Sequence, residues 1–210
     1  MLPLPITCSM IHPDTELRFI SPEIGFGVVA TKLIPKGTIT WVFDSLDQII
    51  SPQKLEQMDP LQKVFLEKYC YRDHTGNYVL CGDHARFVNH SFRSSCMSTA
   101  YDCEVAVRDI LPGEELTDDY GYLNPSEPFD CVPEEGCTRT RVLPDDLLNF
   151  HPEWDAQLRE AFENFSSVEQ PLLHMLTPAH RAKVLAVAAG QAPMDSILNC
   201  YYDASKVREE

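Results

Sequence analysis

The spacing of apolar residues changes along this chain and divides it into a β-rich part and a helical part. Up to about Tyr122, short β-branched and apolar runs are separated by turn residues, as in "FGVVATKLI", "PKGT" and "ITWVFD". Beyond that point apolar residues recur at helical spacing in "HPEWDAQLREAFENF", and "TPAHRAKVLAVAAG" has Thr177 to cap a helix and Gly190 to end it. The pattern predicts a mainly β fold with α additions, followed by a C-terminal helical region.

Finer features of the pattern predict individual elements. The stretch "SPQKLEQMDPLQKVFLEKYCY" predicts a short helix after a turn at Asp59 and Pro60, because its apolar residues have helical spacing: Leu61, Val64, Phe65 and Tyr69. We expect "GNYVLCGDHARFVNH" to return to strand, and "CEVAVRDILPGEEL" to form a strand, a Pro-Gly turn and a second short strand. The piece "HPEW" should open the first C-terminal helix, which presents one apolar face: Trp154, Leu158, Phe162 and Phe165.

Length and composition bound the class of protein. A chain of 210 residues suits one domain, or one domain with a helical appendage. No eighteen apolar residues follow one another and the start has no basic leader, so we expect no membrane partner and an intracellular location, cytoplasmic or, in a eukaryote, nuclear. The cysteines are scattered, which favours mostly free thiols: Cys8, Cys70, Cys81, Cys96, Cys103, Cys131, Cys137 and Cys200.

The net charge of −15 disfavours direct binding of nucleic acid, which depends on clustered Lys and Arg. Between Asp102 and Glu135 there are eleven acidic residues and a single basic one, Arg108. Such a segment could attract a basic peptide, or it could be only a solvated acidic face. The sequence indicates no particular oligomeric state.

Three short motifs carry polar or glycine residues where a strand would ordinarily keep apolar ones. They are "GFG" at Gly25–Gly27, "RFVNHS" at Arg86–Ser91 and "GEELTDDYG" at Gly113–Gly121. Glycines let a backbone approach a ligand closely, and the Asn89 amide can both donate and accept hydrogen bonds. Taken singly, these pieces could equally be a strand bulge, a capping turn and a surface turn with a packed tyrosine.

In this order and at this spacing, the three motifs resemble those of the SET-domain protein lysine methyltransferases, over roughly Glu16 to Glu135. The resemblance implies several small sheets around a knot-like crossing. It places a SET catalytic domain at residues 1–135, with an insert at about 45–78, and a helical region at 136–210. It also implies methyl transfer from S-adenosylmethionine to a lysine side-chain amine of a protein, possibly in a basic histone-like tail.

The same resemblance suggests a role for particular residues. Tyr120 matches the family's catalytic tyrosine. The residues matching the cofactor site are Gly25, Phe26, Gly27, Arg86, Asn89, His90 and Tyr120, with Phe129 or Trp154 as candidates to stack on adenine. The candidates for the lysine channel are Tyr69, Tyr71, Tyr78, Asp118 and Tyr122. The tyrosines before residue 80, and Trp154, could also be ordinary core residues.

Two departures from the family pattern leave details open. Asp118 stands where the family often has Phe or Tyr, and its carboxylate could hold an ammonium or a water, or point to solvent, so the number of methyl groups added is not predicted. Phe92 stands where zinc-containing members have a cysteine. Only Cys131 and Cys137 remain, with Cys96 as the least unlikely further ligand. Because two thiolates seldom hold structural zinc without help, we predict no metal site, although the sequence leaves open whether Cys131 and Cys137 join one.

Two other classes of function remain open. One is a catalytically weak SET-like module that binds S-adenosylmethionine or a basic peptide. The other is a hydrolase that uses His90 and Ser91, although the chain lacks a Gly-x-Ser-x-Gly turn. The intact Tyr120 favours the methyltransferase.

Overall fold

The computed structural model describes residues 10–205. The strands are β1 (Thr15–Ser21), β2 (Gly25–Ala30), β3 (Ile39–Val42), β4 (Gln48–Ile50), β5 (Cys70–Arg72), β6 (Tyr78–Leu80), β7 (Asn89–His90), β8 (Cys96–Ser98), β9 (Cys103–Ala106), β10 (Thr117–Asp118), β11 (Phe129–Asp130) and β12 (Arg141–Val142). The α-helices are α1 (Pro52–Glu56), α2 (Pro60–Tyr69), α3 (Asp146–Phe165) and α4 (Pro178–Ala188). The 3₁₀ turns are η1 (His84–Phe87), η2 (Tyr120–Tyr122), η3 (Leu173–Met175) and η4 (Ile197–Cys200).

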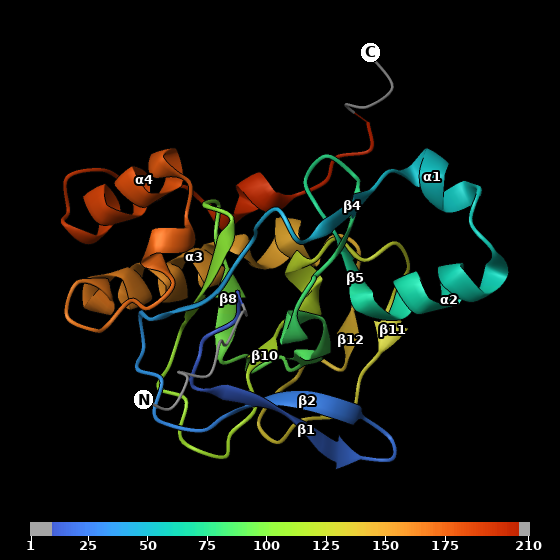
Figure 1. The fold of residues 1–210 in the computed structure, drawn as a ribbon, viewed down its shortest axis with the longest axis horizontal. Helices are drawn as coiled ribbons and strands as arrows, with labels where there is room; N and C mark the ends of the chain where they lie inside the picture. The colour runs from blue at the N-terminus through green and yellow to red at the C-terminus, as the bar shows by residue number, and fades with distance from the viewer. Residues whose placement is uncertain (1–9, 206–210) are drawn as a thin grey trace, which may run out of the picture.

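Small sheets form the middle of the molecule. Their strand orders are β1-β2, β10-β7, β11-β12, β3-β9-β8 and β4-β6-β5. Figure 1 shows helices α3 and α4 on one side of these sheets and the insert helices α1 and α2 on the opposite side. The prediction of a mainly β fold with a helical C-terminal region is therefore confirmed.

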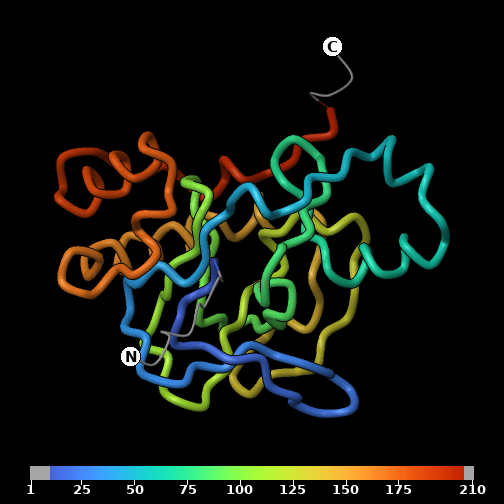
Figure 2. The backbone as a smooth tube through the Cα atoms, viewed as in Figure 1, coloured from blue at the N-terminus to red at the C-terminus, as the bar shows by residue number. Residues whose placement is uncertain are grey.

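The three sequence motifs come together where two chain segments cross. Strands β7 and β10 pair in parallel, with Asn89 opposite Thr117 and His90 opposite Asp118. The amide of Leu116 donates to the carbonyl of Val28 over 2.8 Å, which joins the third motif to β2. In Figure 2 the segments at 84–91 and 113–122 both pass through the centre of the molecule, above the β1-β2 hairpin. Segments far apart in sequence thus become neighbours.

The C-terminal helices share a hydrophobic core with the sheet β3-β9-β8. The face of α3 predicted from the sequence is buried there, together with residues of β3 and β9: Trp154, Leu158, Phe162, Phe165, Ile39, Val42 and Val105. The turn before β3 fits closely against α3, since a Cβ added to Gly37 would lie 2.6 Å from the Ala161 carbonyl oxygen. Gln170 fixes the same turn, donating to the Gly37 carbonyl and accepting from the Ile39 amide.

Helix α3 begins earlier than predicted. It starts at Asp146, so Pro152 lies inside it rather than in its first turn. A proline cannot donate to the carbonyl four residues back, here that of Leu148. The Nδ1 atom of His151 lies 3.1 Å from that carbonyl oxygen, which gives it another partner. The expectation that "HPEW" opens the helix was therefore wrong.

Two predicted strands are also shorter than expected. Within "GNYVLCGDHARFVNH" only β6 and β7 are extended, and η1 lies between them because the Asp83 carboxylate accepts from the Ala85 amide and caps the turn. The expected strand "GEEL" makes only an isolated bridge between Glu115 and Val29. A capped turn replaces the strand at 84–87, whereas residues 113–116 still hydrogen-bond to β2 through Ala30 and Val28.

The insert helix was predicted correctly. Asp59 and Gln62 form a capping box at the start of α2, and Pro60 occupies its first turn. Its apolar residues Leu61, Val64 and Phe65 are nevertheless exposed, and only Leu66 is buried. Of the residues of α2, Leu66 alone is therefore buried against the rest of the protein.

Two general expectations bear on this part of the chain. Within residues 10–205, no helix is both long and apolar enough to cross a membrane. The seven cysteines of that range are free thiols, as predicted, and Cys8 lies outside the described residues.

Candidate active site

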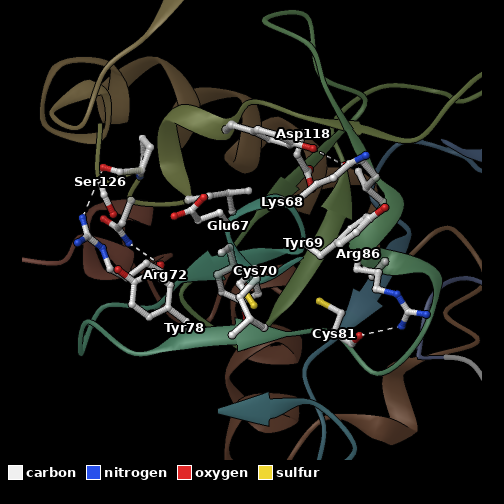
Figure 3. Close-up of a pocket in the computed structure, with 18 of the residues that line it drawn as sticks. Glu67, Lys68, Tyr69, Cys70, Arg72, Tyr78, Cys81, Arg86, Asp118 and Ser126 are labelled. Carbon is white, nitrogen blue, oxygen red and sulfur yellow. Dashed lines mark hydrogen bonds between the residues drawn. The ribbon is translucent and has the colours of Figure 1, made fainter. Parts of the chain in front are cut away.

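A cavity of about 580 Å³ lies between the insert and the crossing of β7 and β10. Figure 3 shows its labelled side chains, with Arg72 and Tyr78 toward one end and Arg86 and Cys81 toward the other. The wall is mainly aromatic and apolar, with a few polar groups: Trp41, Leu66, Tyr69, Tyr71, Tyr78, Val88, Glu104, Asp118, Tyr120, Leu123 and Phe129. Such a mixture is typical of a ligand site.

Tyr120 is fixed at both its backbone and its hydroxyl group. The hydroxyl donates to the Val88 carbonyl over 2.7 Å, and the backbone amide donates to His90 Nδ1 over 3.2 Å. Burial raises the pKa of the Tyr120 phenol, so it stays protonated at neutral pH. The phenol therefore faces the cavity as a held, uncharged group.

The glycine motif and Asn89 meet beside this cavity. The Asn89 amide donates to the Phe26 carbonyl over 3.1 Å and to Glu115 Oε1 over 2.9 Å. A Cβ on Gly27 would lie 2.9 Å from Asn89 Nδ2 and 2.2 Å from that carboxylate oxygen. Glycine is needed at position 27 because two polar side chains approach its backbone so closely.

His90, next to Asn89 in β7, has a buried ring nitrogen without a hydrogen-bond partner among the residues that the structure describes. Its Nδ1 accepts from Tyr120, so the ring proton belongs on Nε2. Burial lowers the pKa of His90 and keeps the ring neutral. The Nε2 atom is buried and meets no hydrogen-bond partner among residues 10–205. The ring packs against Phe92, Tyr120 and Phe129, which leaves a buried donor beside aromatic surface.

Arg86 lines the cavity and holds the preceding turn. Its guanidinium donates to the carbonyls of Cys81, at 3.2 Å, and Asp83, at 3.0 Å. It also lies 5.0 Å from the ring centre of Phe87. These contacts fix the segment that leads into Asn89.

Two of the carboxyl groups that line the cavity, those of Asp118 and Glu104, come from the strands behind it. Asp118 is buried, accepts from the Tyr122 hydroxyl over 2.8 Å and shares a hydrogen bond with Glu104. Burial raises the pKa of Asp118 to about 6 and that of Glu104 well above its ordinary value. Glu104 was missed in the sequence, where the signal was a single acid between Cys103 and Val105 in an otherwise apolar strand.

The expected channel tyrosines divide into two groups. Tyr69, Tyr71 and Tyr78 line the cavity, as does Trp41, which the sequence did not single out. Tyr122 instead lies in the core, where its hydroxyl holds Asp118 and its ring packs 5.3 Å from that of Trp154. It supports the cavity wall from behind.

Trp154 is in the wrong place to stack on a ligand in this cavity. Its side chain is 5% exposed and packs in the α3 core beside Tyr122 and Phe150. Phe129, the other candidate, lines the cavity and is 37% exposed. Trp154 is therefore a core residue of the α3 face, as its helical spacing indicates, and the local match of "HPEW" to the family does not make it a stacking residue.

Glu134 ties the segment after the third motif to the second motif. Its carboxylate accepts from the Ser91 hydroxyl over 3.0 Å and from the Phe92 amide over 2.9 Å. Cys131 and Cys137 flank this contact as free thiols. The chain from Met10 to Ser205 contains no group of three or more His, Cys, Asp or Glu residues arranged to hold a metal ion.

Comparison with known families agrees with this arrangement. Residues 25–121 match the family model of the SET domain, a range that starts at the glycine motif and ends just after Tyr120. Comparison with curated proteins gives no significant match. The SET family is generally associated with S-adenosylmethionine-dependent methyltransferases. The motifs, the crossing that joins them and the family match together identify residues 25–121 as a SET domain.

Proposed function

We propose that this protein is an S-adenosylmethionine-dependent methyltransferase that modifies a lysine side chain of a protein substrate. The observation that carries the proposal is the position of Tyr120. Its phenol lines the aromatic cavity, while its backbone is bonded to His90, next to the Asn89 and glycine-motif cluster. A donor held on one side and an amine held on the other would meet beside this hydroxyl.

The residues near His90 fit S-adenosylmethionine. The buried Nε2–H of His90 needs an acceptor, which the adenine ring contains, and the exposed ring faces of Phe26 and Phe129 can pack on the cofactor. Asn89 and the backbone of Gly25, Phe26 and Gly27 form the polar side of the same region. When bound, this cofactor supplies a methyl group on a sulfonium. Arg86 supports the arrangement by holding the turn that carries Asn89.

The cavity residues would hold and orient the target amine. Tyr69, Tyr71 and Tyr78 form walls that exclude water from a long side chain. Lysine must be uncharged to act as a nucleophile, and the apolar part of the wall disfavours the charged form of the amine. The Tyr120 hydroxyl, fixed by the Val88 carbonyl, positions the reacting nitrogen and stabilises developing charge.

The charge of the protein favours a basic substrate segment. The net charge of −15 and the acidic run from Asp102 to Glu135 would attract a Lys- or Arg-rich peptide and repel nucleic acid. A histone-like tail has this chemistry. The proposed substrate is therefore an intracellular protein that contains such a basic segment.

The test is transfer of labelled methyl from S-adenosylmethionine to proteins of a cell lysate, followed by mass spectrometry of the modified residues. We expect label on lysine with the wild type and about a hundredfold less with Tyr120→Phe, the scale of losing one oriented hydrogen-bond donor. Tyr202→Phe, which removes a phenol hydroxyl outside the cavity, is the matched control and should retain activity. Cofactor binding without transfer to any protein would instead favour the catalytically weak binding module.

A further inference from the structure

We propose that Glu104 and Asp118 together form a binding site for the cationic head of the target side chain, inside the cavity beside Tyr120. The proposal rests on the proposed function and adds the chemical group that recognises the substrate. It implies that the side chain enters as an ammonium ion, which the carboxylate stabilises, and that the ammonium passes its proton to that carboxylate before the nitrogen acts as a nucleophile.

The two carboxyl groups are placed in the cavity wall by separate elements. Glu104 lies in the central strand of β3-β9-β8, opposite Trp41 on one side and Ser98 on the other, so the three side chains share one face of the sheet. Asp118 reaches the same cavity from β10. Ser98 donates to Glu104 over 3.3 Å and Tyr122 donates to Asp118 over 2.8 Å.

The pair carries one uncompensated negative charge. Glu104 keeps its proton and donates a hydrogen bond to the Asp118 carboxylate, so the two acids hold one proton between them. Across residues 10–205, no ion pair joins either acid to a lysine or arginine. A buried charge without a partner is costly, so a cation bound in the cavity would gain the missing ion pair.

The basic residues that line the cavity are occupied elsewhere. The Arg86 guanidinium donates to the carbonyls of the turn that precedes Asn89. Lys68 lies over the Tyr69 ring at 5.3 Å, and Arg72 lies over the Tyr202 ring at 4.5 Å. None of the three therefore supplies the counter-ion of the acid pair.

Trp41 provides an independent indication of a ligand. It is 6% exposed and lines the cavity, and its buried indole N–H meets no acceptor within the described part of the chain. Because Trp41 stands opposite Glu104 in the sheet, its aromatic ring and the acid pair border the same space. The ring and the carboxylate suit an alkyl chain with a cationic nitrogen, whereas the indole N–H needs an acceptor, which the amine offers only after it has lost its proton.

The experiment measures binding of small probes by NMR chemical-shift titration, without S-adenosylmethionine or a protein substrate. The probes are n-butylammonium, which copies the end of a lysine side chain, and 1-pentanol, its uncharged counterpart of similar size. We expect the wild type to bind butylammonium at least tenfold more tightly. Trimethylsulfonium, which has the charge but no N–H donor, is a third probe and should bind more weakly than butylammonium.

Variants separate charge from hydrogen bonding. In Glu104→Gln the amide can still donate to Asp118, so the negative charge and the preference for butylammonium should persist. The double variant Glu104→Gln/Asp118→Asn carries no charge and should bind the two probes within twofold of each other. Glu67→Gln removes an exposed carboxyl at the cavity rim and should behave as the wild type.

Equal binding of butylammonium and 1-pentanol by the wild type would overturn the proposal, and so would an unchanged preference in the double variant. Tighter binding of trimethylsulfonium than of butylammonium would assign the pair to a sulfonium instead. These readouts do not depend on turnover, so a protein that binds butylammonium but transfers no methyl would contradict the proposed activity alone.

Discussion

The hydroxyl of Tyr120 donates to the backbone carbonyl of Val88 over 2.7 Å, and this bond joins the last sequence motif to the middle one. Both residues line the cavity. The phenol is thereby held against a backbone group that does not move independently of the crossing of β7 and β10. The position of the proposed catalytic hydroxyl thus follows from the topology of the chain.

Removing this hydroxyl should affect stability only slightly. Tyr120→Phe loses one buried hydrogen bond, which should lower the free energy of unfolding by about 1 kcal/mol. Urea denaturation would measure the change. A loss above about 3 kcal/mol would show that the bond maintains the crossing itself, so that lost activity could not be assigned to chemistry.

Gly37→Ala should be more destabilising than Gly113→Ala, although both glycines have a φ near +90°. The alanine Cβ at position 37 would lie 2.6 Å from the Ala161 carbonyl oxygen, whereas position 113 has nothing within 4 Å. Both variants lose about 1 kcal/mol or more from backbone strain, so their difference isolates the close packing of the turn on α3. Equal losses in thermal unfolding would mean that the turn can move away from α3.

Arg139 links two buried acids, and its loss should be severe. It pairs with Asp119 and Asp146, whose side chains are 1% and 2% exposed, and it lies 4.3 Å from the ring centre of Phe150. Arg139→Gln leaves two buried carboxylates without their cation, which should cost about 3 to 5 kcal/mol in unfolding free energy.

The matched control is Arg141→Gln, which breaks an exposed pair with Asp130 and should change the free energy of unfolding by less than about 1 kcal/mol. Similar losses for the two variants in denaturant titrations would contradict the assignment of Arg139 as the link between the third motif and α3.

Glu134→Ala should loosen the segment at 129–137. The Glu134 carboxylate accepts from the side chain of Ser91 and the amide of Phe92, and these bonds hold the segment against the second motif. Losing two bonds to a charged group should speed amide hydrogen exchange across the segment by about tenfold or more. Glu135→Ala, which removes a neighbouring exposed carboxylate, should leave the exchange unchanged.

The acid pair should make the protein less stable as pH rises. Burial raises the folded pKa of Asp118 to about 6, above its unfolded value near 3.9, so the folded state binds more protons between these values. Stability is therefore highest when the pair is protonated and falls as pH increases through about 6. Glu104 has the same direction of shift.

The double variant Glu104→Gln/Asp118→Asn should lack this penalty. Its unfolding free energy relative to the wild type should increase by about 1 to 3 kcal/mol between pH 4 and pH 7, the range that spans the unfolded and folded pKa of Asp118. Urea titrations at the two values measure the difference. Parallel pH dependence of the two proteins would show that the carboxyl groups are solvated rather than buried.

The sequence by itself determined the local features. The turn at Asp59 and Pro60, the α2 helix, the buried face of α3 and the three motifs were all readable because turns, apolar periodicity and short motifs depend on neighbouring residues. The family match at 25–121 rests on the same local signals.

Only the tertiary structure decided which residues share the cavity. Trp154 has the spacing of a helix face and is buried in the core, while Glu104 appeared to be an ordinary strand residue and faces the cavity beside Asp118. The physical reason is that a strand or helix fixes the direction of a side chain, but the element packed against it fixes what that side chain meets. Here the parallel pairing of β7 and β10, and the insert folded beside them, set those neighbours over separations that no local pattern encodes.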